Sequence, residues 1–132
     1  MNVKKYIIAG IVVFIIFQLS GFVIHNIMLQ DTYQKLHNLW RPDMMAYMWI
    51  MYITSLIVSF IFTYLYIKMD KKGGLIQGLI FGTIVGLFMN VGIFNQFAIY
   101  PLPFYLVVQW FIYEMISYVI CGAIISFVYK YK

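Results

Sequence analysis

Charged residues are scarce in this sequence. They make up 10% of its 132 residues, whereas hydrophobic residues make up 64%. Soluble domains average about 25% charged residues, so this chain has too few charges to cover the surface of a water-soluble globule. We therefore expect lipid to be the solvent for most of its surface.

Residues that carry catalysis or hold metal ions are equally scarce. The single cysteine, Cys121, leaves no partner in the chain for a disulfide and excludes a cysteine-based metal cluster. The sequence has no nucleophile–His–acid set, no H-E-x-x-H motif, no Walker loop and no Rossmann glycine pattern. These absences predict that the protein is not an enzyme.

The net charge of +5 does not indicate nucleic-acid binding, because the basic residues form no contiguous patch. They lie at the ends of long apolar runs, where Lys and Arg contact phospholipid head groups and set the topology of a membrane protein. The partner expected from this pattern is the lipid bilayer.

Four apolar runs are each long enough to cross a hydrocarbon core of about 30 Å as an α-helix. They cover Tyr6–Met28, Met44–Ile67, Leu75–Tyr100 and Phe104–Tyr129. Lipid offers no hydrogen-bond partners to an open backbone, so helices are the expected structure. Short connections make consecutive helices antiparallel neighbours. The sequence therefore predicts an all-α integral membrane protein, an antiparallel up-down four-helix bundle that forms one domain over residues 1–132.

The lysines are distributed unequally between the two sides of this bundle. Seven fall on the side that holds both ends of the chain: Lys4, Lys5, Lys68, Lys71, Lys72, Lys130 and Lys132. The other side has Lys35 and Arg41, each with an acid nearby, Asp31 and Asp43. The positive-inside rule then predicts a multi-pass protein with both termini in the cytoplasm.

The longest connection, Leu29–Asp43, has its own pattern. Leu29, Tyr33, Leu36 and Trp40 recur at helical spacing. The polar residues elsewhere around the helix are Asp31, Gln34, Lys35 and Asn38. Such a pattern is typical of a short amphipathic helix that lies on the membrane surface. We therefore expect a short external amphipathic helix between the first two spans.

Several short motifs are spread over most of the chain. They are His25-Asn26-x-Met28-Leu29 with Tyr33, Leu39-Trp40-Arg41-Pro42, and Pro101-Leu102-Pro103 with Trp110. A further motif is the glycine ladder, Gly78, Gly82 and Gly86, which follows Lys71-Lys72-Gly73-Gly74. With these motifs the chain resembles a group of small four-span bacterial membrane proteins of unassigned function. The resemblance implies a bacterial inner (cytoplasmic) membrane protein and no particular activity.

Polar residues are costly inside a membrane, so their depth is informative. Pairing the third and fourth spans through the turn at residues 100–104 places Asn90 level with Glu114, and Asn95 level with Gln109. Counting the same depth on the other spans predicts one intramembrane polar layer. Its members are Gln18, Thr54, Ser55, Asn90 and Glu114.

Glu114 is the only acidic residue in the four predicted spans. We expect it to face the bundle interior and to accept hydrogen bonds from Asn90 or Gln18, because a carboxylate exposed to lipid costs several kcal/mol. It indicates either a site that handles protons or cations, or a carboxyl group that joins helices through hydrogen bonds.

His25 lies near the outer end of the first span, on one stripe with Gln18. Three roles remain open: an axial haem ligand, a proton relay toward Glu114, or a structural hydrogen-bonding histidine. We predict an outer polar site formed by His25, Asn26, Arg41, Asn95 and Gln109. No resident metal or cofactor is expected, with haem or quinone as the alternative.

Gly78, Gly82 and Gly86 form a double G-x-x-x-G pattern on the third span. Residues without side chains let two helices approach closely. The pattern predicts either close packing within the bundle or an interface with a second chain.

Three functions follow from these features. The first is a structural or accessory subunit, or a homo-oligomer, that acts through helix packing with other membrane-protein subunits. The second is a small oligomeric transporter or channel that uses the polar layer around Glu114. The third is a haem- or quinone-linked electron-transfer subunit that uses His25.

Overall fold

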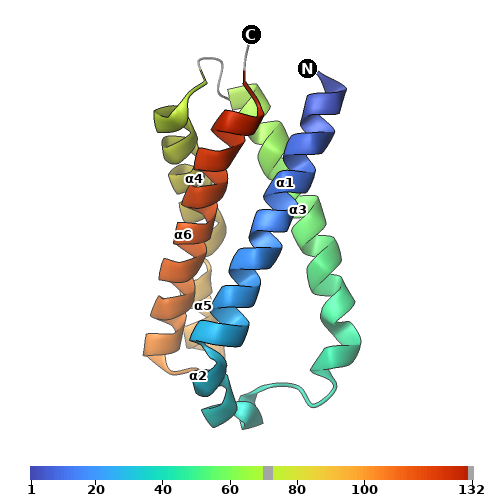
Figure 1. The fold of residues 1–132 in the computed structure, drawn as a ribbon. Helices are drawn as coiled ribbons and strands as arrows, with labels where there is room; N and C mark the ends of the chain where they lie inside the picture. The colour runs from blue at the N-terminus through green and yellow to red at the C-terminus, as the bar shows by residue number, and fades with distance from the viewer. Residues whose placement is uncertain (70–72, 131–132) are drawn as a thin grey trace.

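The computed structural model describes residues 1–69 and 73–130, and it confirms the all-α fold (Figure 1). The long helices are α1 (Val3–Phe22), α3 (Met48–Met69), α4 (Leu75–Asn90) and α6 (Phe104–Val128). Two short helices, α2 (Gln30–Lys35) and α5 (Ile93–Ile99), complete the described α-helices.

Single helical turns of other types extend two of the long helices. A π-helical turn, Val23–Met28, continues α1, and a 3-10 turn, Met44–Tyr47, precedes α3. The resulting segments of 25 or 26 residues are long and apolar enough to cross a membrane: Val3–Met28, Met44–Met69, Leu75–Ile99 and Phe104–Val128. The chain thus has the four candidate transmembrane helices of a multi-pass membrane protein, as the sequence predicted.

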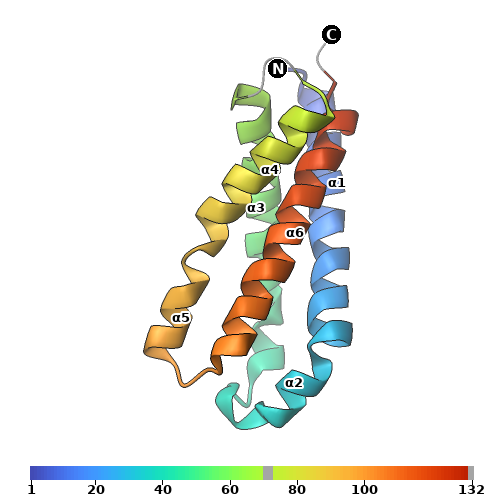
Figure 2. The same cartoon turned by 90° about the vertical axis from the view of Figure 1, so that its left-hand side faces the viewer.

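Both ends of the chain lie at one end of the bundle, which we call the terminal end, and α2 lies at the other, the α2 end (Figure 1). The four long helices do not form a closed square. Helix α6 packs against α1 and, most extensively, against α4, while α3 packs mainly on α1 (Figure 2).

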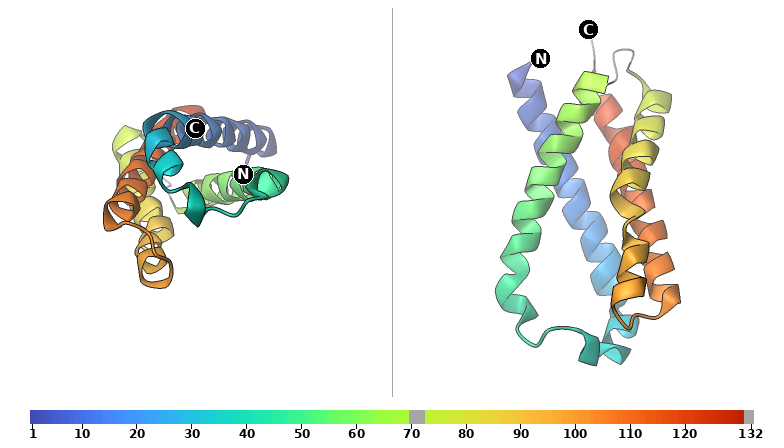
Figure 3. Two further views of the ribbon diagram at one scale, coloured as in Figure 1. Left: turned by 90° about the horizontal axis from the view of Figure 1, so that it is seen from below. Right: turned by 180° about the vertical axis from the view of Figure 1, so that it is seen from behind.

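Helices α3 and α4 are neighbours, as expected of consecutive spans, but over only part of their length. These helices meet near the terminal end, where the Phe81 ring lies 4.8 Å from Phe62 and 5.3 Å from Tyr66. Toward the α2 end, α3 diverges from α4 and α5 (Figure 3, right). Residues 70–72, in the short connection between them, lie outside the described residues.

A packed core fills the terminal end of the bundle. Phe62, Tyr66, Cys121 and Ile125 are each at most 1% exposed. The Phe17 ring also reaches this core from α1. The larger of the two cavities described below lies toward the α2 end.

The glycine ladder forms the close contact between α4 and α6 (Figure 2). A Cβ atom added at Gly82 would lie 2.5 Å from the Tyr118 carbonyl oxygen, and one added at Gly86 would lie 2.8 Å from the Tyr118 Cβ. Gly78 faces Gly122 of α6, a glycine outside the predicted pattern. The ladder therefore packs within one chain, which is the first of the two roles expected from the sequence.

The third span is interrupted, although the apolar run in the sequence is continuous. Helix α4 ends at Asn90 and α5 begins at Ile93. The Asn90 side chain donates a hydrogen bond of 2.9 Å to the Gly86 carbonyl oxygen, in the last turn of α4. Such bonds to the preceding turn often bend helices, and Gly92 has a low helix propensity.

Helix α2 closes the α2 end. Leu29, directly before it, is fully buried together with Leu106 and Val107 of α6, and Tyr33 and Trp40 pack against the same cluster. The predicted amphipathic helix is thus present but short, and its apolar side covers the bundle.

Candidate functional site

The main candidate site is a cavity of about 660 Å³ between α1, α3 and α6. We call it the Glu114 cavity. The residues Tyr33 and Trp40, in the segment between α1 and α3, line it as well. Its lining combines a small group of polar side chains with a larger apolar surface.

His25 and Glu114 meet in this cavity. His25 Nε2 lies 3.6 Å from Glu114 Oε1, and the two side chains are 36% and 28% exposed. His25 belongs to the π-helical turn that extends α1. Such turns occur frequently at functional sites. The structure therefore brings together the two ionisable residues that the sequence singled out within the spans.

Tyr33 connects His25 to α6. Its hydroxyl oxygen lies 2.6 Å from His25 Nδ1, and Trp110 Nε1 donates to the same oxygen at 2.7 Å. An indole N–H can only donate, so the Tyr33 hydroxyl accepts from Trp110 and can donate its own proton to His25. A neutral His25 then carries its proton on Nε2, which faces Glu114.

The Tyr33 phenol is held in its neutral form. Its pKa is raised to about 12, mainly because burial disfavours the phenolate, while the hydrogen bond from Trp110 lowers the pKa and the nearby Glu114 carboxylate raises it. A second indole holds the main chain at this residue, because Trp40 Nε1 donates to the backbone carbonyl oxygen of Tyr33 at 3.3 Å. Tyr33 therefore remains a hydrogen-bond donor to His25 at neutral pH.

The predicted polar layer is partly assembled around this cavity. Gln18, Thr54, Ser55 and Glu114 all line it. Gln18 Nε2 donates to Ser55 Oγ at 2.8 Å and so joins α1 to α3. The Thr54 hydroxyl instead donates within α3, to carbonyl oxygens one turn earlier.

Asn90 does not join this layer, which corrects the expectation that it pairs with Glu114. Its side chain is buried and bonds to Gly86, four residues earlier on the α4 face that packs on α6. Glu114 lies on the part of α6 that faces the cavity and α1. Equal depth in the membrane therefore did not place the two residues on facing surfaces.

The predicted outer polar site is also divided. Asn26 lines the cavity beside His25. Arg41 instead pairs with Asp43, with Nε 2.8 Å from Oδ1. Asn95 is exposed on α5. Gln109 does not line the cavity, and among the described residues its buried Oε1 has no hydrogen-bond partner.

Three aromatic site residues were not in the predicted site: Tyr33, Trp40 and Trp110. The amphipathic pattern placed Tyr33 and Trp40 on one apolar side, and Trp110 lies four residues before Glu114, on the same face of the helix. These patterns indicated burial. The hydrogen bonds depend on the path of the chain between Leu29 and Trp40, which helical periodicity does not define.

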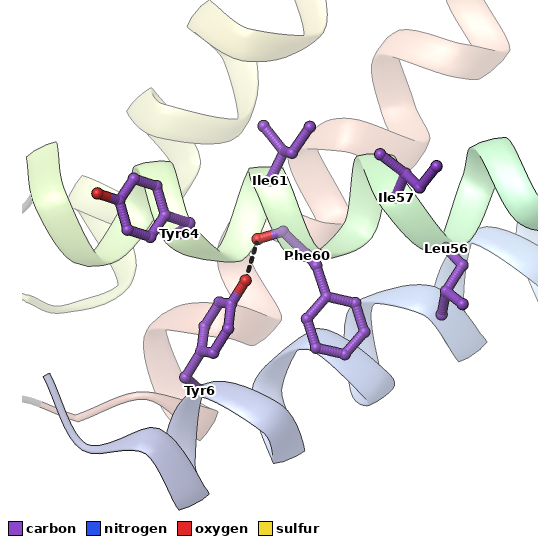
Figure 4. A pocket seen from close by; sticks show the side chains of 6 residues that line it. All are labelled: Tyr6, Leu56, Ile57, Phe60, Ile61 and Tyr64. Carbon is purple, nitrogen blue, oxygen red and sulfur yellow. Dashed lines mark hydrogen bonds between the residues drawn. The ribbon is translucent and has the colours of Figure 1, made fainter.

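A second hollow of about 400 Å³ lies between α1 and α3 near the terminal end (Figure 4). The Tyr6 hydroxyl donates to the Phe60 carbonyl oxygen at 3.2 Å, and the other side chains are apolar except for Tyr64. This hollow has no charged side chain in its lining and is a groove in the apolar surface. It is a weaker candidate than the Glu114 cavity.

Metal binding has little support in the described part of the chain, residues 1–69 and 73–130. No group of three or more His, Cys, Asp and Glu residues there is arranged to hold a metal ion. A haem iron would have to displace His25 from Tyr33 or from the side facing Glu114.

Comparisons with models of protein families, with curated proteins and with solved structures found no match to this chain. The function must therefore be argued from the chemistry of the Glu114 cavity.

Proposed function

We propose that this protein is a membrane-embedded binding protein, with an amphipathic small molecule as the ligand of the Glu114 cavity. One observation carries the proposal. The cavity, of about 660 Å³, has polar groups at His25, Tyr33 and Glu114 and an otherwise mainly apolar wall. Small-molecule sites typically measure about 300–1,000 Å³ and combine a mostly apolar lining with a few polar groups.

The apolar part of the wall suits a ligand with a hydrophobic body. It includes Phe17 and Phe22 of α1, Met48 and Met51 of α3, and Val58 deeper along α3. Methionine side chains are flexible and adapt to ligands of different shape. The polar groups would orient such a ligand, because they lie together on α1, α2 and α6.

A role as a structural or accessory subunit, or as a homo-oligomer, receives less support. The sequence argument for an intermolecular seam depended on Gly78, Gly82 and Gly86. These glycines already contact α6 of the same chain. A complex with other membrane-protein subunits would have to use a different surface.

The packed core argues against a continuous pore through one protomer. Phe62, Tyr66 and Tyr118 are buried between the cavity and the terminal end. A transporter would need a movement of α3 to open a route on that side. Binding is therefore the simpler proposal, and transport would be a further step built on it.

We also propose a bacterial inner (cytoplasmic) membrane location, with both termini cytoplasmic and α2 outside. The seven lysines on the side of the termini support the orientation. The resemblance to small four-span bacterial membrane proteins supports the assignment to the bacterial inner membrane. Single-cysteine variants in a Cys121→Ser background test the orientation. A membrane-impermeant maleimide should label Asp31→Cys in intact cells and Lys4→Cys only after lysis. The reverse labelling pattern would refute the orientation.

Native mass spectrometry of the purified protein tests the binding function. We expect the wild type to retain a small molecule and Gly21→Phe to lose it, because Gly21 lines the cavity and an added Cβ meets nothing within 4 Å. Gly92→Phe is the matched control, since Gly92 is equally unobstructed but lies outside the cavity. Equal occupancy in both variants would contradict binding in this cavity.

A further inference from the structure

The charges around the Glu114 cavity are unbalanced. Glu114 supplies a carboxylate, and none of the described residues that line the cavity is Lys or Arg. Arg41 follows the lining residue Trp40, but it is exposed and pairs with Asp43. The cavity therefore has a negative group without a permanent positive partner.

The Glu114 carboxylate also has free hydrogen-bonding capacity. Its contact with His25, 3.6 Å between Oε1 and Nε2, is longer than a normal hydrogen bond. It is the one polar contact of this carboxylate among the described residues. A carboxylate offers about four acceptor positions, so a ligand group with several N–H donors can bind here without displacing His25.

Aromatic rings form a continuous wall next to this carboxylate. The rings of Tyr33 and Trp40 are 5.3 Å apart between centroids, and those of Trp40 and Trp110 are 6.3 Å apart. All three residues line the cavity. The faces of tyrosine and tryptophan rings attract cations, most strongly in sites shielded from water.

We propose that the ligand is an amphipathic organic cation. Its ammonium group contacts the Glu114 carboxylate and the aromatic wall of Tyr33, Trp40 and Trp110, and its hydrophobic body lies against α1 and α3. This inference rests on the proposed binding function and adds the charge of the ligand. An anionic ligand fits poorly, because its charge would face Glu114 without a basic residue to compensate.

Two probes of matched size test the inference. They are 1-adamantylamine, which is cationic at neutral pH, and 1-adamantanol, which is neutral. Binding to the full-length protein in nanodiscs of zwitterionic lipid can be followed through tryptophan fluorescence, because Trp40 and Trp110 line the cavity. We expect the amine to bind at least about tenfold more tightly than the alcohol.

Glu114→Gln should remove this preference, because it keeps the shape of the side chain and removes its charge. Asp31→Asn is the matched control. It removes one negative charge from the first turn of α2 but lies outside the cavity lining. We expect Glu114→Gln to weaken amine binding at least tenfold, and Asp31→Asn to leave it nearly unchanged.

Trp40→Leu provides a second test that does not depend on the folding of Glu114→Gln. It removes a ring from the wall, and we expect it to weaken binding of the amine more than binding of the alcohol. The cation inference is overturned if the wild type binds both probes equally, or if the Glu114→Gln and Trp40→Leu variants keep the wild-type preference.

The two proposals can fail separately. If the wild type binds neither probe but retains a small molecule in native mass spectrometry, the cation inference fails and the binding function stands. If it binds neither probe and retains nothing, both proposals fail.

Discussion

The Tyr33 hydroxyl lies 2.6 Å from Nδ1 of His25, so the short helix α2 is hydrogen-bonded to the end of the first span. The same hydroxyl accepts a hydrogen bond from Trp110. One phenol therefore holds the end of the first span, α2 and α6 together beside the Glu114 cavity.

Tyr33→Phe removes both of these hydrogen bonds. At roughly 0.5–1.5 kcal/mol each, their loss should lower the free energy of unfolding by about 1–3 kcal/mol. Hydrogen–deuterium exchange should become faster in residues 30–39. Tyr47→Phe is the control, because Tyr47 is exposed on the turn before α3. Equal exchange in the two variants would show that the Tyr33 hydroxyl does not hold α2.

The raised pKa of Tyr33 predicts how stability changes at high pH. Its folded-state pKa is about 12, against the ordinary 10.0, because burial disfavours the phenolate. The unfolded chain therefore loses this proton first, and the contribution of Tyr33 is complete below pH 10 and declines as the pH rises toward 12. The ultraviolet absorbance of phenolate in wild type minus Tyr33→Phe measures the titration. A midpoint near pH 10 would contradict the burial of this phenol.

Gly82→Ala tests the contact between α4 and α6. The added methyl group would lie 2.5 Å from the Tyr118 carbonyl oxygen, so the helices must separate. We expect a loss of about 1–3 kcal/mol in the free energy of unfolding, as in other overpacked sites. Gly92→Ala is the control, because a Cβ there meets nothing within 4 Å and its φ of −66° suits alanine. Unchanged stability in Gly82→Ala would contradict close packing at this position.

The hydrogen bond between Gln18 and Ser55 is a direct polar link between α1 and α3. A double-mutant cycle with Gln18→Leu and Ser55→Ala should give a coupling energy of about 0.6 kcal/mol, the average for such bonds in a membrane protein. Thr83→Ala with Gln18→Leu is the control cycle, because the Thr83 hydroxyl bonds within α4. A coupling of zero in the first cycle would mean that this bond contributes nothing to the pairing.

The four spans could be predicted from the sequence because a membrane helix needs a long apolar run, which is visible without a structure. The divergence of α3 from α4 could not be predicted in this way. Lipid surrounds an exposed apolar side chain as readily as protein does, so the apolar pattern does not reveal which helices touch. The interruption after Asn90 was missed for a related reason, since Leu75–Ile99 as a whole is long and apolar enough to be one continuous span.

The candidate site was predictable where depth and helix face agreed. His25 and Gln18 share a stripe on α1 that faces the cavity, and Glu114 lies on the inward sector of α6. Asn90 had the correct depth, but its position four residues after Gly86 turns it toward the glycine contact. The role of Tyr33 depended on an irregular connection whose path is set by packing.

The divergence of α3 has a thermodynamic consequence. The cavity is lined on one side by α6, which is tightly joined to α4, and on the other by α1 and by α3, which is held mainly through α1. A ligand that contacts both sides stabilises the arrangement in which α3 is docked, by an amount that grows with the logarithm of its concentration relative to the dissociation constant. Occupancy of the cavity and attachment of α3 are therefore linked equilibria. Any modification that loosens α3 must also lower the affinity for the ligand.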